Sequence, residues 1–73
     1  MNKERRALIA KAMEQINEAR SMLEQARDEE GDYFEAMPEP FKESDRGRAT
    51  EDGLDKLSEV LDTLENLDDL SDL

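Results

Sequence analysis

The 73-residue sequence lacks cysteine, histidine and tryptophan, and it contains only three aromatic residues. Without cysteine no disulfide can form, and without cysteine or histidine a zinc site of the usual kind is excluded. A single apolar core in so short a chain stabilises a monomer only marginally. We therefore predict one domain that depends on helix packing and on association with a second chain.

Long apolar runs are also missing. The basic start of the chain, from Met1 to Arg6, resembles the first part of a signal peptide, but Lys11, Glu14 and Glu18 interrupt the segment that follows. No apolar run approaches the roughly 18 residues that a membrane-spanning helix needs. We therefore expect a cytoplasmic protein without a membrane partner.

Basic residues are few, with 10 lysines and arginines against 21 acids and a net charge of −11. Residues 1–27 carry six bases and four acids, a net of +2, so the other 46 residues carry 4 bases and 17 acids, a net of −13. A field of that sign repels phosphate and attracts basic surfaces. We predict no direct nucleic-acid binding and a protein partner with a basic surface.

The apolar residues recur with helical spacing, which a disordered chain of similar charge would lack. Residues 3–34 are mostly strong helix formers, and heptads that start at Ile9 alternate large and small apolar side chains. The a positions are Ile9, Ile16 and Leu23, and the d positions are Ala12, Ala19 and Ala26. The pattern predicts a helix whose alanines face a closely packed neighbour.

A second amphipathic helix is predicted over residues 44–71. Its apolar seam is formed by Leu54, Leu57, Leu61 and Leu64. Two residues, Ser44 and Thr50, could each cap its start, because both precede acids. We favour a start near Ser44, with an irregularity over residues 47–53 and fraying beyond Leu67.

Residues 35–43 connect the helices, and their two prolines end a helix and hold the chain extended. We therefore predict an all-α fold, an antiparallel αα-hairpin with coiled-coil packing. Antiparallel pairing, with a shift of one heptad left open, sets Ala26 against Leu54, Leu23 against Leu57, Ala19 against Leu61 and Ile16 against Leu64. The same register sets Tyr33 against Gly47, and the small residues Gly47, Thr50 and Gly53 would form a recess for Tyr33, Phe34 or Phe41.

Apolar side chains beside these seams would stay uncovered in an isolated hairpin. Such stripes usually mark an association surface, so we predict a homodimer that forms a four-helix bundle. The self-association candidates are Leu8, Met13, Met22, Val60 and Leu67.

Side chains that carry most enzyme chemistry are scarce in this chain. Histidine and cysteine are absent, and neither a glycine-rich phosphate loop nor a nucleophile elbow appears. None of the three glycines stands sixth in a calcium loop that begins with a carboxylate. We predict a protein that is not an enzyme and that holds neither a metal nor a cofactor.

Two features are candidates for partner binding. Residues 33–41, in the loop and the helical turn before it, include every aromatic residue, and their side chains either close the end of the hairpin or form a binding knob flanked by arginine. The second helix carries an acidic ridge, which keeps the protein soluble, pairs with Arg20 and Arg27 across the hairpin, or meets a basic surface. The partner-binding candidates are Tyr33, Phe34, Met37, Phe41, Arg46, Glu59, Asp62 and Glu65.

The connection also carries a resemblance. The run from Asp32 to Glu39, DYFEAMPE, followed by Ser44-Asp45-Arg46-Gly47 and an acidic leucine-rich helix, resembles a group of short uncharacterised bacterial and phage proteins. These share an aromatic-x-x-Met-Pro-Glu connection. The resemblance implies a helical hairpin and a phage or prophage setting, and it implies no catalytic or binding residue.

Two hypotheses of function follow from the sequence. The first is a non-catalytic helical protein that self-associates and acts by binding another protein. The alternative is an acidic mimic of nucleic acid that inhibits a host nucleic-acid-binding or defence enzyme.

Overall fold

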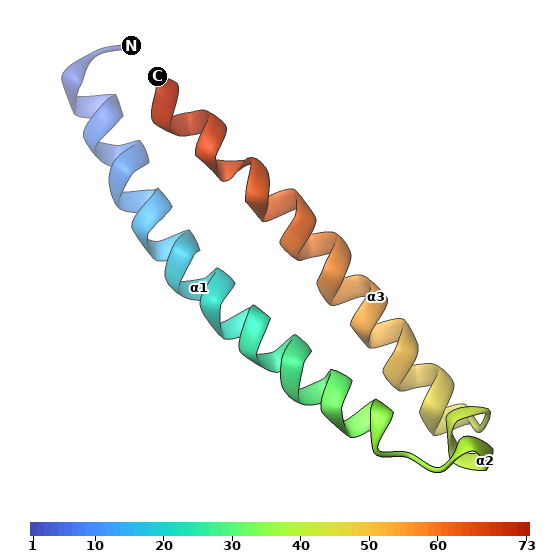
Figure 1. Cartoon of the computed structure of the whole chain (residues 1–73). Coiled ribbons are helices and arrows are strands. Elements are labelled where there is room, and N and C mark those ends of the chain that lie inside the picture. Colours follow the sequence, from blue (N-terminus) through green and yellow to red (C-terminus); the bar gives the residue numbers. More distant parts are fainter.

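The computed structural model describes residues 1–73, and the chain is helical along nearly its whole length. Its elements in chain order are α1 (Lys3–Glu35), α2 (Glu39–Lys42), α3 (Asp45–Glu65) and the 3-10 helix η1 (Asn66–Asp72). α1 runs the length of the molecule, and α3 and η1 pack along it, with both termini at one end (Figure 1). The prediction of an all-α chain with a second helix packed on the first is confirmed.

The start and end of α1 follow from local chemistry. The side chain of Asn2 caps the helix, accepting a hydrogen bond from the backbone N–H of Arg5 at 2.9 Å. The helix ends at Glu35, and Ala36 is its C-cap. Pro38 follows shortly, and a proline disfavours helical geometry in the residue before it. The predicted range of 3–34 is therefore correct to within one residue.

The connection differs from the prediction at its second proline. Pro38 is extended, with φ −59° and ψ 149°, but Pro40 lies in the first turn of α2. A proline suits the first turn because its φ is already helical and because the N–H it lacks would have no partner there. The expectation that both prolines hold the chain extended is wrong for Pro40.

α3 begins where Ser44 caps it, accepting a hydrogen bond from the N–H of Gly47 at 3.3 Å. The start favoured from the sequence is confirmed, whereas the predicted irregularity over residues 47–53 is absent. Gly47 is required here because a Cβ would overlap the carbonyl oxygens of Phe41 and Lys42. The recess predicted for an aromatic ring is therefore filled by the backbone of α2.

The end of the second helix was predicted as α-helix to residue 71 with fraying beyond Leu67. The α-helix instead ends at Glu65, and η1 continues to Asp72. A 3-10 helix has about three residues per turn, which rotates its side chains relative to those of α3. Leu67 is buried as a result, although the heptad pattern placed it beside the seam.

The face of α1 that packs on α3 also differs from the heptad prediction. Its half-buried apolar and basic residues are Ile9, Met13, Ile16, Arg20, Leu23, Arg27 and Phe34. The alanines expected at the interface, Ala12, Ala19 and Ala26, are exposed. Methionine and arginine have long flexible stems that cover leucine side chains better than a methyl group does, and arginine keeps its charged end in water.

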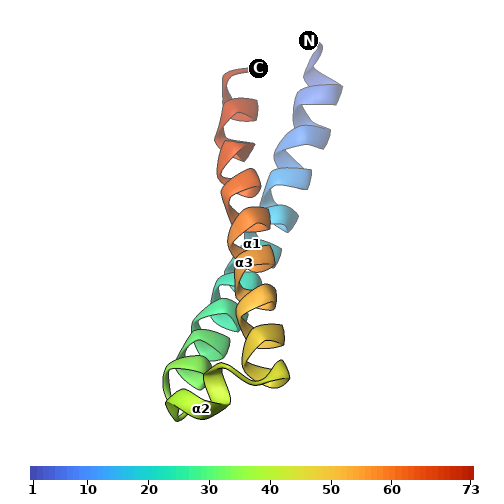
Figure 2. The ribbon, with the colours of Figure 1, turned by 90° about the vertical axis from the view of Figure 1, so that its right-hand side faces the viewer.

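Little of the molecule is buried. Among 73 residues only Gly47, Leu61 and Leu67 are buried, with Leu61 4% and Leu67 8% exposed. The molecule measures 57 × 15 × 14 Å, and its radius of gyration of 17.0 Å exceeds the roughly 11 Å of a compact domain of this length. Figure 2 shows the helices crossing at a shallow angle with no third layer over them. The fold is thus a two-helix rod with open sides.

Candidate functional site

The loop end of the rod divides the predicted aromatic cluster into two parts. Phe34 and Met37 are half-buried where α1 leads into α2, whereas Tyr33 and Phe41 are 46% and 61% exposed. Exposed aromatic rings beside a fixed backbone are frequent anchors of protein interfaces. Tyr33 and Phe41 therefore stay available to a partner, and Phe34 and Met37 help to close the loop.

Lys42 holds this end together, and the sequence did not single it out. Its Nζ lies 5.4 Å from the centroid of the Phe34 ring, 3.6 Å from a carboxylate oxygen of Glu39 and 3.9 Å from one of Glu35. The contacts with Phe34 and Glu35 connect α2 to the end of α1, and the one with Glu39 lies within α2. The signal available in the sequence was that Lys42 is the single basic residue in an acidic connection and lies three positions after Glu39.

The corner between α2 and α3 is fixed by two further contacts. The Ser44 hydroxyl donates a hydrogen bond to the carbonyl of Phe41, and its oxygen accepts one from Gly47. The close approach of Gly47 to the backbone of α2 sets the same corner. Phe41 is thus presented on a short helix that is anchored on both sides.

Of the nine acids of α1 and the seven of α3, eight lie on one side of the rod. On each long helix, the residues that follow the inward-facing ones by one position lie on a common face, because one step turns a helix by about 100°. The inward-facing residues of α3 are the buried or half-buried Gly47, Thr50, Leu54, Leu57, Leu61 and Leu64. This acidic face contains eight acids and one base, a net charge of −7, and its charged members are Glu14, Glu24, Asp28, Glu35, Arg48, Glu51, Asp55, Asp62 and Glu65. The predicted candidates Asp62 and Glu65 belong to it, whereas the exposed Glu59 lies on the back of α3.

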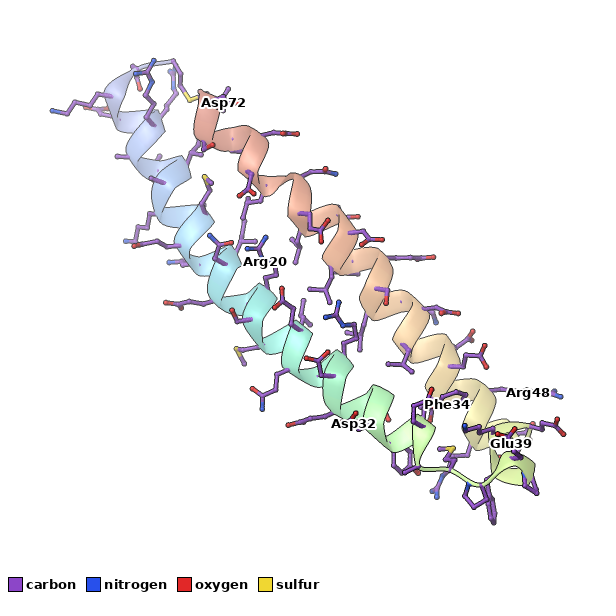
Figure 3. The ribbon with its side chains drawn as sticks, viewed as in Figure 1. Arg20, Asp32, Phe34, Glu39, Arg48 and Asp72 are labelled. Atoms are coloured by element: carbon purple, nitrogen blue, oxygen red, sulfur yellow. The ribbon has the colours of Figure 1, made fainter.

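The surface near the start of α3 is hollowed where residues of the acidic face meet two residues outside that face, Ala49 and Asp52. An open depression of about 440 Å³ near the start of α3 is lined by Arg48, Ala49, Glu51, Asp52 and Asp55. Arg48 points away from the rod at this end (Figure 3). The depression is a surface feature rather than an enclosed cavity.

The two arginines expected to neutralise the acids of α3 do not reach them. Arg20 and Arg27 face α3, and Figure 3 shows Arg20 on that side of α1. Their ion-pair partners lie on α1 itself, with Arg20 3.9 Å from Glu24 and Arg27 3.5 Å from Asp28. No ion pair joins α1 to α3, so the predicted pairing across the helices is wrong.

The self-association candidates are placed differently from one another. Leu8, Met22 and Val60 are 68%, 72% and 48% exposed. Met13 is half-buried against η1, where it lines a groove with Ile9 and Leu70, and Leu67 is buried. Leu67 is therefore not part of an open surface.

A second face lies opposite the acidic one. It consists of the residues that precede the inward-facing ones by one position, and we call it the alanine face. On α1 its members are Leu8, Ala12, Gln15, Ala19, Met22, Ala26, Glu29 and Tyr33. On α3 they are Arg46, Ala49, Gly53, Lys56, Val60 and Thr63. With one acid and two bases, its net charge is +1.

No three His, Cys, Asp or Glu side chains are grouped closely enough to hold a metal ion. None of the helices combines the length and the apolar character needed to cross a membrane. Comparison of the chain with family models, with curated proteins and with solved structures gives no match.

Proposed function

We propose that this chain is a non-catalytic helical hairpin that acts by binding, both to a second copy of itself and to another protein. The observation that carries the proposal is the mismatch between its core and its surface. Two leucines and a glycine are buried, while eight large hydrophobic side chains are exposed. Apolar area left open on this scale usually marks an interaction surface.

In this proposal, the other protein binds the loop end and the acidic face. Phe41 supplies an exposed ring, and the acids of α3 favour a partner with a basic surface. The resemblance of the connection to short bacterial and phage proteins supports a phage or prophage setting as part of the same proposal.

Affinity capture from the native host, with identification of the bound proteins, tests this proposal. The bait carries the wild-type sequence or Phe41→Ala, and Gln25→Ala is the control because Gln25 is exposed in mid-helix on α1, outside the acidic face and the loop end. Loss of an aromatic anchor at an interface typically weakens binding by about 30-fold or more. Recovery of the same partner by all three baits would contradict a role for the loop end.

A second candidate is an acidic mimic that occupies a nucleic-acid-binding surface. The net charge of −7 on one face favours it, because a flat array of carboxylates resembles a row of phosphates. Binding to such a target would fall steeply with salt and be competed by DNA. The variant Asp62→Lys with Glu65→Lys would abolish it, whereas Phe41→Ala would leave it unchanged.

A further inference from the structure

We propose that the alanine face binds a second copy of the chain with the two α1 helices antiparallel and the two-fold axis between Arg20 and Ser21. This inference rests on the self-association in the proposed function and adds the surface, the orientation and the register.

The spacing of the alanine face suits a second helix. Its members on α1 recur at alternating steps of four and three from Leu8 to Tyr33, which is the heptad spacing of a coiled-coil seam. All of them are exposed, and most are apolar or small. This seam lies about a third of a turn around α1 from the one that packs on α3. A helix in a four-helix bundle needs two such seams, one for each neighbour.

The face continues onto α3 without an acid. From Arg46 to Thr63 the alanine-face residues avoid every acid of α3, although that helix contains seven. Because α1 and α3 are antiparallel and both stripes precede their inward-facing residues by one position, the stripes lie on the same side of the rod. The stripe that would meet a second copy thus contains a single acid, Glu29, in a molecule of charge −11, and it is the side on which two copies repel each other least.

The charge along α1 selects the antiparallel orientation. Residues 1–20 carry five bases and three acids, a net of +2, and residues 21–35 carry one base and six acids, a net of −5. Antiparallel packing sets each basic half against the acidic half of the other copy, and parallel packing sets like against like.

The register follows from individual layers. With the axis between Arg20 and Ser21, Leu8 of one copy packs on Tyr33 of the other, and Ala19 packs on Met22. The same register brings Lys11 beside Asp32, and neither has an ion-pair partner within its own chain. A shift by one heptad sets Glu18 either against itself or against Asp32, so like charges disfavour both alternatives.

The same axis also suits α3. At the open end of the rod, Ile9 and Met13 of α1 line one groove with Leu70 of η1. When the inward-facing residues of the two helices are paired in order from that end, Arg20 lies level with Leu61. Val60, which is 48% exposed and precedes Leu61, therefore lies close to the axis. Both copies of Val60 would meet there, and the acidic faces would point outward on either side of the dimer.

Disulfide trapping tests the orientation, because the chain has no cysteine of its own. The two single-cysteine variants, Leu8→Cys and Tyr33→Cys, are purified separately. Each variant alone and a mixture of the two are then oxidised, and the products are compared on a non-reducing gel. The two positions lie roughly 37 Å apart along α1, so a disulfide reports one orientation only. The expected result is a cross-linked dimer in the mixture and none in either variant alone. Self-cross-linking of each single variant would overturn the antiparallel arrangement.

A matched pair of charge variants tests the face, with the dimer dissociation constant measured by sedimentation. Met22→Glu adds a carboxylate to the alanine face near the axis, and Ser21→Glu adds one to the acidic face a single residue away. Met22→Glu is expected to raise the constant by about tenfold or more, and Ser21→Glu by no more than about threefold. Equal effects would overturn the choice of face but leave self-association standing. A wild-type chain that stays monomeric at micromolar concentration would overturn both.

Discussion

Gly47 shows how one residue can fix the loop end of the rod. Alanine favours a helix over glycine by about 1 kcal/mol, so propensity alone would make Gly47→Ala stabilising. A Cβ at this position, however, would overlap backbone carbonyl oxygens of α2, which cannot turn aside as a side chain can. We expect the steric term to dominate and the free energy of unfolding to fall by about 1–3 kcal/mol.

The control for this prediction is Gly31→Ala. Gly31 also lies within a helix, but nothing stands within 4 Å of a Cβ built there. Gly31→Ala should therefore raise the free energy of unfolding by up to about 1 kcal/mol. Chemical denaturation followed by circular dichroism, at one protein concentration, measures both variants. A stabilising Gly47→Ala would show that α2 does not press on α3 as described.

At the scale of elements, the rotation of α1 about its own axis decides whether its alanines or its arginines face α3. Arg20 faces α3 with a side chain 28% exposed, whereas Ala19 is exposed. The ion pair of Arg20 with Glu24 is long and half exposed, so it contributes a few tenths of a kcal/mol at most. A leucine in its place would extend the seam of α1 opposite Leu61. We predict that Arg20→Leu raises the free energy of unfolding by about 1 kcal/mol.

Arg5→Leu is the control for Arg20→Leu, because Arg5 is exposed at the start of the same helix. It should change the free energy of unfolding by less than about 0.5 kcal/mol. If Arg20→Leu is neutral or destabilising while Arg5→Leu is neutral, Arg20 does not lie in the seam. The heptad assignment with alanine facing α3 would then regain support.

The contrast between Arg20 and Ala19 also shows what could be predicted from the sequence. Caps, prolines and helix formers act locally, so the starts of both helices at Lys3 and near Ser44 could be predicted closely. The rotation of α1 could not, because Ile9, Ile16 and Leu23 are shared by both possible seams. Which neighbours face α3 depends on side-chain length across the interface, and apolar periodicity does not contain that information.

The candidate site could be predicted in part for the same reason. Tyr33 and Phe41 could be predicted as partner-binding candidates because all aromatic residues lie in or beside the loop. The role of Lys42 could not, because it depends on α2, a single helical turn that is hard to predict in a segment with two prolines. Likewise, burial of Leu67 depends on a change from α to 3-10 geometry. Such effects arise from packing between elements rather than from periodicity within one.

At the scale of the whole molecule, the distribution of charge should govern stability. The chain holds −11 in a rod 57 Å long, and its acidic face alone carries −7, against four ion pairs that all involve exposed carboxylates. Repulsion between acids therefore outweighs attraction between pairs, and dissolved salt screens repulsion over a Debye length that falls from about 30 Å at 0.01 M to about 10 Å at 0.1 M.

We predict that the melting temperature rises with sodium chloride, by roughly 4–8 °C between 0.01 M and 0.5 M, which corresponds to about 1 kcal/mol for a domain of this size. Asp62→Asn with Glu65→Gln removes two charges from the acidic face and should flatten this dependence, because less repulsion is left to screen. Neutralising Lys56, which takes part in no ion pair, should steepen it. A melting temperature that falls as salt is added would mean that ion pairs, not repulsion between acids, dominate the electrostatics of the rod.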